Sequence, residues 1–540
     1  MKKTLLIVLL TTLCSGLHAQ TQVKSASKPA SGSSLLSGMF SGPAGSVIIL
    51  QNNAKNDLTL TAKKETGITY SNNTFSFATP FPDSSKYKVS IKKFPTGQTA
   101  IIYAGATGTM PQITNTLRVC SDYTYDHVSR SSDDKTFSTF YETNDPSIGG
   151  NTGEEGRYVA FVSASSGFAG TSGRHRQIFW RDRNTGTTKL ISAAPNGEEG
   201  NGDSYAPAIS GDGKSVAFES YSSNLGESDK NGFRDIFIWH STTNQIETVS
   251  IGAKGLEADA ESYEPTVSGD GNLVAFTSNA GNISAIKKGT SNNNVFLRDL
   301  LNDVTTLISV DPESRTGGGG SRPSISSNGN RIAFYSHTAT LVKNDNNGFW
   351  DIFLWEKGQP KLRRISLTAD HKERNQGSES ANRIVAPSIS GDGQFIAYTT
   401  TAGNMVPGDD NNLQDVFVYD IAKDTTIIAS INASGKPGDA DSPIEQGEKI
   451  AISFDGKWVA FSTKATNLGV PASNILMRNM VTGENRVVSS VAGSSVGRPT
   501  MSRSGCYVVF GIGGQLDSRF PSSGIFAHYT GLGRCRFCPE

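Results

Sequence analysis

The sequence predicts an all-β protein, and three observations support this fold class. Glycine accounts for 57 of the 540 residues, and serine, asparagine and threonine are also frequent, which is typical of a chain with many turns. No long stretch after the N-terminus shows the spacing of apolar residues that an amphipathic helix requires. A glycine followed by a short apolar strand recurs over the last three quarters of the chain, which indicates an internal repeat.

The first residues have the pattern of a secretory signal. Two lysines precede an apolar stretch, residues 4–13, that is too short to span a bilayer, which needs about 20 residues. Cys14 raises the alternative of a lipoprotein, but the leucine before it is too large for that motif. We therefore expect residues 1–19 to be a signal peptide that is cleaved after Ala19. The mature chain would be exported to the periplasm or cell surface, or secreted, in a Gram-negative-type bacterium.

The charge balance argues against a polyanionic partner. The 50 lysine and arginine residues equal the 50 aspartate and glutamate residues, so the formal net charge is zero. A nucleic-acid-binding protein usually carries a basic surface, and none is expected here. No segment after the signal is apolar enough to form a transmembrane helix. We therefore expect a monomer without a membrane span, whose partners are envelope or surface proteins or glycans.

An N-terminal module precedes the repeats. Residues 20–40 are rich in serine, alanine and glycine, and we expect them to form a flexible linker. Residues 41–121 contain short strand-like runs, such as 47–53 and 87–93, with turn residues between them. This pattern predicts a small β-sandwich.

Several short motifs of this module, among them Asp57-Leu-Thr-Leu and Leu117-Arg-Val-Cys, follow a recognisable order. In this order the module resembles an immunoglobulin-like repeat domain of bacterial surface proteins. In that family a cysteine after Gly-Gln-Thr pairs with a cysteine on the last strand. Ala100 stands at the first position here and Cys120 at the second, so the resemblance implies that this disulfide is lost. Cys120 is then a small buried residue or pairs with Cys506 or the C-terminal tail.

A glycine before an apolar strand marks seven copies of one unit. Successive glycines lie 49 to 64 residues apart. In most copies a strand with a proline near its start lies upstream, and an Asp-Gly turn of the kind found in hairpins joins the two strands. The sixth copy departs from this pattern, because its strand begins at Lys449 without a proline. The seven glycines are Gly156, Gly213, Gly271, Gly329, Gly393, Gly456 and Gly505.

Each unit continues with a third and a fourth strand, which are residues 236–239 and 246–250 in the second copy. A single four-stranded sheet of this kind cannot bury both of its apolar faces. Sheets stacked face to face around an axis bury these faces and leave only short edges. The sequence therefore predicts an about seven-bladed β-propeller of four-stranded blades, preceded by the small β-sandwich.

The residues of the repeat resemble a known family. The run from Ser210 to Phe218, Ser-Gly-Asp-Gly-Lys-Ser-Val-Ala-Phe, resembles the PD40 (WD40-like) signature of TolB-like propellers, as do the Asp-Ile-Phe segments at Asp235 and Asp351. This resemblance implies the propeller fold and protein partners near the cell envelope. It does not imply that the chain is TolB itself, because the N-terminal domain differs and more blades are expected. The motif residues are turn and core positions, so they specify the fold rather than the function.

Closure of the ring requires one more strand. The seventh copy supplies only three strands, the last of them at residues 524–529. Phe137–Tyr141 is strand-like and otherwise unassigned, so we expect it to complete the last blade from the other end of the domain. The expected boundaries are 122–135 for a linker, 136–531 for the propeller and 532–540 for a C-terminal tail.

The tail contains a C-x-x-C motif formed by Cys535 and Cys538. A redox or metal site would need a helix start or a second pair of ligands, and the sequence offers neither. We therefore expect a local disulfide or two free thiols.

One polar pattern, D-x-N-x-x-x-D, recurs before the third strand of three units. Carboxylate and amide oxygens at this spacing suit a hard cation such as Ca²⁺, which an exported protein would meet. The alternative is structural, because Asp and Asn side chains also stabilise turns by bonding to nearby backbone N–H groups. The sequence favours turns and leaves calcium as the second interpretation. The three triplets are Asp229, Asn231 and Asp235; Asp345, Asn347 and Asp351; and Asp409, Asn411 and Asp415.

No catalytic motif and no cofactor-binding motif is found, and no cofactor other than possible calcium is expected. The favoured hypothesis is a non-enzymatic binding or scaffold protein that uses the propeller for protein–protein interaction at the bacterial envelope. The alternatives are a polysaccharide lyase or hydrolase that uses the central pocket, and a glycan-binding lectin. Propeller enzymes need charged groups that converge on the axis from the first strands. Those strands, such as 206–210 and 322–326, are expected to be mostly small and apolar, which counts against an enzyme.

Overall fold

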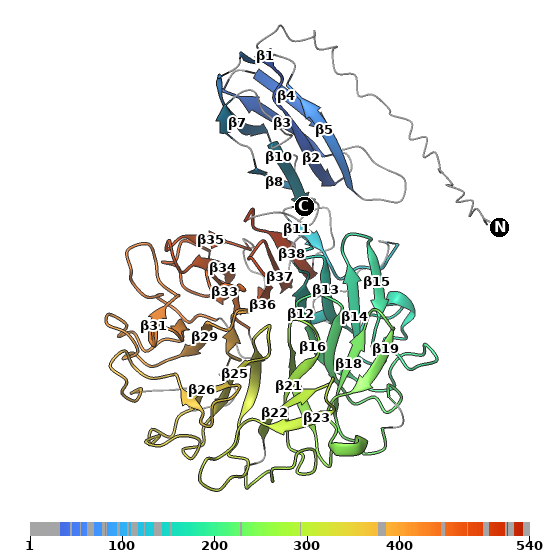
Figure 1. The fold of residues 1–540 in the computed structure, drawn as a ribbon, viewed down its shortest axis with the longest axis vertical. Helices are drawn as coiled ribbons and strands as arrows, with labels where there is room; N and C mark the ends of the chain where they lie inside the picture. Colours follow the sequence, from blue (N-terminus) through green and yellow to red (C-terminus); the bar gives the residue numbers. More distant parts are fainter. Residues whose placement is uncertain are drawn as a thin grey trace, which may run out of the picture.

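The protein is described by a computed structural model and consists almost entirely of β-strands (Figure 1). A small sandwich at the N-terminal end lies beside a larger ring of sheets. Two short 3₁₀ helices, Phe168–Gly170 and Ala253–Gly255, are the helical elements of the described residues. The structure describes residues 33–43, 46–54, 56–61, 70–77, 81–82, 84–93, 98–104, 107–109, 117–123, 125–133, 143–151, 154–226, 229–291, 293–375, 385–443, 449–471, 473–489, 496–513, 516 and 523–532.

The N-terminal module has two four-stranded sheets, ordered β5-β2-β10-β8 and β4-β3-β7-β9, and a short pair, β1-β6. Phe40 of one sheet and Ile48 and Leu50 of the other belong to one core and are fully buried. The predicted β-sandwich is therefore present. The strands are β1 (Ser33–Ser34), β2 (Ser37–Pro43), β3 (Val47–Asn52), β4 (Asn56–Thr61), β5 (Tyr70–Ser76), β6 (Phe81–Pro82), β7 (Lys86–Lys93), β8 (Gln98–Ala104), β9 (Thr107–Thr109) and β10 (Leu117–Tyr123).

The first strands of this module begin earlier in the chain than predicted. Strands β1 and β2 begin inside the segment predicted as a linker, because β2 pairs in parallel with β10 over residues 38–41 and fills the centre of its sheet. An immunoglobulin-like topology stays a prediction. Cys120 lies on β10, and the predicted signal peptide lies outside the described residues.

The described part of the ring comprises seven four-stranded sheets, so the predicted propeller is confirmed. Blade 1 comprises β12 (Thr143–Gly149), β13 (Tyr158–Ser163), β14 (Gln177–Asp182) and β15 (Thr187–Leu190). Blade 2 comprises β16 (Ser204–Ile209), β17 (Ser215–Ser220), β18 (Asp235–His240) and β19 (Gln245–Thr248). Blade 3 comprises β20 (Ser262–Val267), β21 (Leu273–Ser278), β22 (Asn294–Asp299) and β23 (Val304–Leu307). Blade 4 comprises β24 (Ser321–Ile325), β25 (Arg331–Ser336), β26 (Asp351–Glu356) and β27 (Arg363–Arg364). Blade 5 comprises β28 (Ser388–Ile389), β29 (Phe395–Thr400), β30 (Asp415–Asp420) and β31 (Thr425–Ile428). Blade 6 comprises β32 (Ala451–Ile452), β33 (Trp458–Thr463), β34 (Asn474–Asn479) and β35 (Asn485–Val487). Blade 7 comprises β36 (Val496–Met501), β37 (Tyr507–Ile512), β38 (Gly524–Tyr529) and β11 (Tyr125–His127).

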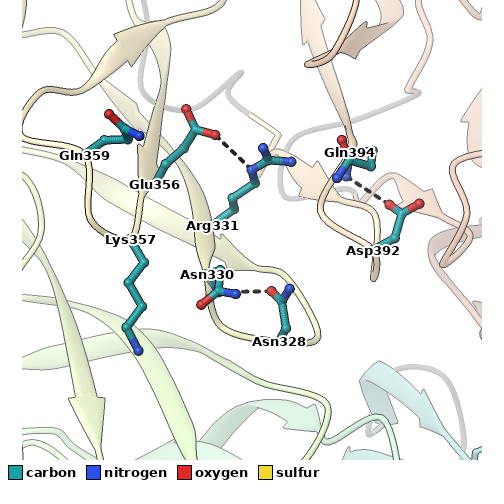
Figure 2. Close-up of a pocket in the computed structure, with 8 residues that line it drawn as sticks. All are labelled: Asn328, Asn330, Arg331, Glu356, Lys357, Gln359, Asp392 and Gln394. Atoms are coloured by element: carbon teal, nitrogen blue, oxygen red, sulfur yellow. Dashed lines mark hydrogen bonds and ion pairs between the residues drawn. The ribbon is translucent and has the colours of Figure 1, made fainter.

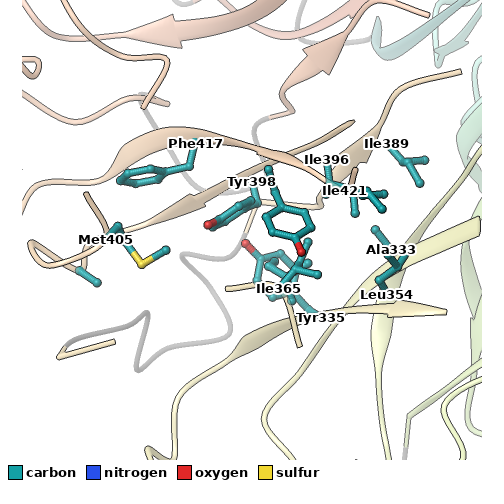
Figure 3. Packing of buried hydrophobic residues seen from close by; sticks show 13 residues of the cluster. Ala333, Tyr335, Leu354, Ile365, Ile389, Ile396, Tyr398, Met405, Phe417 and Ile421 are labelled. Atoms are coloured by element: carbon teal, nitrogen blue, oxygen red, sulfur yellow. The ribbon is translucent and has the colours of Figure 1, made fainter. Parts of the chain in front are cut away.

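Packing between neighbouring blades forms the core. Between blades 4 and 5, Tyr335 and Leu354 contact the cluster that contains Ile396 and Tyr398 (Figure 3). Every residue of the second strand β17 is buried, because this strand lies inside its sheet and neighbouring sheets cover both faces. The apolar faces that no blade can bury alone are thus covered by its neighbours, as the repeat predicts.

The recurring glycine has a clear role in this packing. Gly213 has φ 75°, which favours glycine, and a Cβ atom there would lie 2.1 Å from the Tyr158 ring of the preceding blade. The turn before it is fixed by Asp212, whose carboxylate accepts hydrogen bonds from Ser210 Oγ (2.5 Å) and from the backbone N–H of Lys214 (3.0 Å). The Ser-Gly-Asp-Gly signature is therefore both a turn and a contact between blades.

The closing strand differs from the prediction. Strand β11, Tyr125–His127, pairs antiparallel with β38 and completes blade 7. The predicted closing strand, Phe137–Tyr141, lies outside the described residues, and β11 holds the place expected for it. Asp126 of β11 also forms a buried ion pair with Arg183, which follows the third strand of blade 1, at 2.9 Å. The ring is thus closed by strand pairing and by a charge pair between its first and last blades.

Candidate functional site

The first strands of all seven blades line one cavity of about 460 Å³ on the axis of the propeller. Each strand contributes small or apolar residues, such as Pro207 and Ala208 in blade 2. Charged side chains join them at one position of the strand, just before the proline. Glu264, Arg322 and Arg498 hold this position in three blades, and Lys449 holds it in blade 6, where no proline follows.

Local backbone geometry produces this arrangement. In five blades the register of hydrogen bonds between the first and second strands shifts at the proline, because proline has no N–H to donate. The residue before the proline has a left-handed φ in each of these bulges, between 48° and 56°. A non-glycine residue in such a conformation costs of order 1–3 kcal/mol, and strain of this kind is common at functional sites. The five residues are Asp145, Ala206, Glu264, Arg322 and Arg498.

One side of the cavity carries a group of three charges. Asp145 forms an ion pair with Arg498 and a second one with Lys449, at 3.6 Å. Burial raises the pKa of Asp145, but the two cations outweigh this effect, so its pKa lies below the usual range. Asp145 therefore stays ionised and holds both cations at the cavity.

A second charged group lies on blades 2 to 4. Arg322 Nε donates to Glu264 Oε1 at 3.2 Å, and the Glu264 N–H donates to Glu219 Oε2 at 2.7 Å. Glu219 in turn pairs with Arg234 at 2.9 Å. Burial raises the pKa of Glu219, and Arg234 opposes this effect. At this position of the first strands there are thus three cations and two carboxylates, which leaves an excess of one positive charge. The cations are Arg322, Lys449 and Arg498, and the carboxylates are Asp145 and Glu264.

The expectation that the first strands are mostly small and apolar is wrong at this position. Five of the seven blades place a charged residue there, and only blades 2 and 5 have alanine, Ala206 and Ala386. The signal was present in the sequence as the residue immediately before each proline. It was missed because a bulge, and not the two-residue period of a strand, sets which residue faces the axis.

Within each predicted Asp/Asn triplet the side chains lie close together, in the turn before the third strand of a blade. In all three the asparagine amide donates to Oδ2 of the last aspartate, at 2.7 Å for Asn231, 3.0 Å for Asn347 and 3.2 Å for Asn411. The asparagine Oδ1 accepts a backbone N–H two residues later in each case. A serine donates at 2.5 Å to the other oxygen of the last aspartate. The triplets are therefore ordered turns of the kind that the structural interpretation describes.

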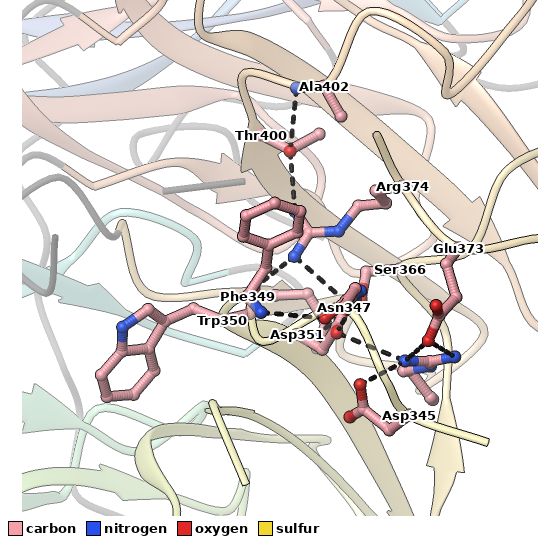
Figure 4. Close-up of polar contacts among 12 residues, drawn as sticks. Asp345, Asn347, Phe349, Trp350, Asp351, Ser366, Glu373, Arg374, Thr400 and Ala402 are labelled. Atoms are coloured by element: carbon pink, nitrogen blue, oxygen red, sulfur yellow. Dashed lines mark hydrogen bonds and ion pairs between the residues drawn. The ribbon is translucent and has the colours of Figure 1, made fainter. Parts of the chain in front are cut away.

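The three turns differ in their counter-charges. In blade 4, Arg364 Nη1 lies 2.6 Å from Asp345 Oδ1 and 3.5 Å from Asp351 Oδ2. Arg374 approaches Asp351 Oδ1 at 3.2 Å and donates to Thr400, as Figure 4 shows. No described cation forms an ion pair with either aspartate of the triplets in blades 2 and 5.

Burial without a counter-charge changes the acidity of these aspartates. It raises the pKa of Asp235 and of Asp409 to about 6 and that of Asp415 to about 7. Among the described residues, no group of three or more His, Cys, Asp or Glu side chains is placed to hold a metal ion. The calcium interpretation stays a prediction.

A second cavity, of about 500 Å³, lies on the surface between blades 4 and 5 and is lined by polar and charged residues (Figure 2). Arg331 is fixed in it by Glu356, at 2.9 Å, and by the carbonyl of Gly393, at 2.8 Å. The remaining walls are formed by amide side chains such as Asn328 and by the charged residues Lys357 and Asp392. The two cations and two carboxylates of this lining balance, so the cavity lacks the excess positive charge of the axial one.

The cysteines do not form a recognisable site among the described residues. Cys506 is a buried free thiol in contact with Ser504 and the carbonyl of Leu532. Burial raises its pKa to about 12, so it stays protonated and inert. Cys535 and Cys538 lie outside the described residues, and their disulfide stays a prediction.

Comparison with known proteins gives similarity at the level of structure. No protein-family model and no curated protein matches the sequence. A TolB structure from Acinetobacter baumannii is 16% identical, with a TM-score of 0.32, and the match covers 64% of this chain and 76% of that one. A putative TolB from Agrobacterium tumefaciens is 12% identical, with a TM-score of 0.33 and coverage of 64% and 94%. An oligogalacturonate lyase from Vibrio parahaemolyticus is 10% identical, with a TM-score of 0.41 and coverage of 75% and 91%.

The assignment of the propeller rests on the seven described sheets and their shared axis. No helix among the described residues is long and apolar enough to cross a membrane.

Proposed function

We propose that this chain is an exported, non-enzymatic binding protein that receives an acidic segment of a partner protein in the axial cavity of its propeller. The observation that carries the proposal is the set of charges on the axis. Arg322, Lys449 and Arg498 exceed their two carboxylate partners by one positive charge. A partner carboxylate would restore the balance in a partly buried place, where an ion pair is stronger than in water.

The rest of the lining also suits a peptide. Prolines and small residues leave room for a chain, and Ile148, Ile209 and Met501 add apolar surface at the same cavity. No aromatic residue lines it among the described residues, although sugar rings commonly pack on aromatic side chains. Because the prolines and the ion pairs fix the walls before binding, little conformational entropy is lost when a ligand enters.

The absence of a catalytic role is part of the proposal. Within the described lining, each acidic side chain is already held by a cation, as Glu264 is by Arg322. Such a carboxylate is poorly placed to act as a general base, because both oxygens of Glu264 already accept hydrogen bonds from Arg322. Export is inferred from the N-terminal pattern of residues 1–19, and the periplasm or the cell surface would then supply the partner.

A binding assay with matched peptides tests the proposal. Two labelled peptide pools that differ only in Asp and Glu against Asn and Gln would be titrated into the mature chain, with binding followed by fluorescence anisotropy. We expect the acidic pool to bind about tenfold or more tightly, and its binding to weaken with added salt.

Two charge reversals locate the binding. Lys449→Glu should remove the preference for the acidic pool, whereas Lys457→Glu, at an exposed turn where Lys457 pairs with Asp455, should leave it unchanged. Equal binding of the two pools, or an unchanged preference in Lys449→Glu, would contradict the proposal. Cleavage of acidic glycans by the wild type would instead support a lyase, and retention of glycans without cleavage would support a lectin.

A further inference from the structure

The three Asp/Asn turns can be compared position by position, because their strands share one register. Arg364 of blade 4 lies opposite Phe353 on the neighbouring strand. Ile428 of blade 5 lies opposite Phe417, and Thr248 of blade 2 lies opposite Phe237. Each of these phenylalanines is the third residue of its strand, counted from the last aspartate of the triplet. Ile428 and Thr248 therefore stand where blade 4 has its arginine.

In blade 4 this arginine joins the two aspartates of the turn. A single nitrogen of Arg364 is within ion-pair distance of both Asp345 and Asp351. The space between the first and last aspartates is thus occupied by a positive group, which Glu373 also contacts, while Arg374 approaches Asp351 from its other oxygen. The same backbone turn recurs in blade 5, where Asn411 repeats both hydrogen bonds of Asn347.

Blade 5 keeps the two aspartates but not the cation. Asp409 is only 4% exposed, and its Oδ1 atom is buried without a hydrogen-bond partner among the described residues. No described Lys, Arg or His forms an ion pair with Asp409 or Asp415. The other charges that act on the pair, Asp410 and Asp441, are also negative. A buried carboxylate oxygen of this kind is costly unless a cation meets it.

From this comparison we infer that the turn of blade 5 binds a divalent hard cation, of the class of Ca²⁺, in the place of the blade 4 guanidinium. Oδ1 of Asp409 is the first ligand, and the Oδ2 side of Asp415 faces the same charge position. Both are the oxygen ligands that Ca²⁺ prefers, and backbone carbonyls or water would complete its shell. Two carboxylates are fewer than a high-affinity site uses, so we expect affinity in the millimolar range found in extracellular modules.

Blade 2 has the same lack of a cation but is a weaker candidate. Asp229 is partly exposed and accepts the backbone N–H of Asn231 at 3.2 Å. The inference is therefore restricted to blade 5. It concerns a loop outside the axial cavity and does not depend on the proposed function.

The test is calorimetric titration of CaCl₂ into the chelator-treated mature chain, with the unfolding midpoint measured in parallel. We expect binding at about 1 mM or below and an upward shift of the midpoint by a few degrees. Ile428→Arg places a guanidinium at the position that Arg364 holds in blade 4 and should abolish both responses. Ile427→Arg adds the same charge at the adjacent residue, which is 48% exposed, and should leave both responses intact.

Asp409→Asn provides a second variant that changes the ligand without adding bulk, and circular dichroism confirms that each variant is folded. Loss of calcium binding in both Ile428→Arg and Asp409→Asn, with retention in Ile427→Arg, supports the inference. No heat of binding in the wild type at several millimolar Ca²⁺ overturns it. Calcium binding that persists in Asp409→Asn also overturns it, because the ion would then be held elsewhere.

Discussion

The first and second strands of each blade lie side by side but follow different rules. Second strands such as β17 and β33 are buried throughout and have nearly the same residues in every copy. First strands differ from blade to blade at the residue just before the proline, which lines the axial cavity. This residue is Ala206 in blade 2, Glu264 in blade 3 and Arg322 in blade 4. The uniform positions make the repeat close into a ring, and the variable ones give its centre a specific charge.

This comparison predicts that stability is concentrated in the second strands. Phe218 is fully buried and stacks on Phe237 at 5.9 Å. Phe218→Ala should lower the free energy of unfolding by about 3–5 kcal/mol, because it removes apolar contacts and leaves a cavity. Denaturant unfolding followed by tryptophan fluorescence measures this change. A loss below about 1 kcal/mol would show that the space between blades repacks freely.

The closing blade should show the next largest effect, through pH. His127 of β11 is buried beside the carbonyl of Ser523, at 3.1 Å, and burial lowers its pKa to about 4. Since the unfolded state binds the proton near pH 6.5, the free energy of unfolding should fall as pH drops from about 6.5 to about 4. The expected loss is about 3 kcal/mol, since one pKa unit corresponds to about 1.4 kcal/mol.

A variant separates this histidine from other titrating groups. His127→Gln should flatten the pH dependence of stability in that window, whereas replacement of His371, whose side chain is 60% exposed, should not. Thermal unfolding at several pH values provides the measurement. An unchanged slope in His127→Gln would assign the acid sensitivity to another group.

The repeated glycine should matter less than the core but still measurably. Gly213→Ala places a side chain at φ 75° and brings its Cβ against Tyr158. The left-handed conformation alone costs about 1–2 kcal/mol, so we expect destabilisation of about 2 kcal/mol or more. Gly232 has φ 71° and no atom near a Cβ position, so Gly232→Ala isolates the conformational cost from the contact. Equal losses of unfolding free energy in the two variants would show that the contact with Tyr158 adds no cost.

The axis should contribute least to stability. Lys449 is 36% exposed, and its ion pair with Asp145 is 3.6 Å long, while Arg498 also holds that aspartate. Lys449→Ala should therefore change the free energy of unfolding by less than about 1 kcal/mol, even though it weakens binding of an acidic ligand. Denaturant titration measures the free energy of unfolding of this variant, and the peptide assay measures its binding of the acidic pool. A large loss of stability would mean that the axial charges serve folding.

Most of the fold could be predicted because it depends on repetition. Seven glycines at similar spacing specify seven hairpins, and apolar strands that cannot be covered within one unit require neighbours. The closing strand could not be read in the same way, since Tyr125–His127 is only three residues long and includes a charged aspartate. Its place depends on pairing with β38, about 400 residues later, which no local pattern encodes.

The site was harder to predict than the fold. The Asp/Asn triplets were visible because they recur, and the structure shows them as ordered turns. Their difference in charge depends on Arg364, a residue of the fourth strand that is opposite the third only after the sheet has formed. The axial charges required knowledge of the bulge at each proline, since Glu264 or Arg498 would otherwise be assigned to the wrong face.

The pairing of β11 with β38 places the beginning and the end of the propeller in one sheet. During synthesis β11 is made long before its partner, so the ring stays open until the chain has been made as far as β38. Until β38 is made, β11 lacks its partner strand, and an unpaired strand edge of this kind favours aggregation. A chain that ends before residue 524 would lack β38, so β11 would have no partner strand and the ring would stay open even if its other blades are formed.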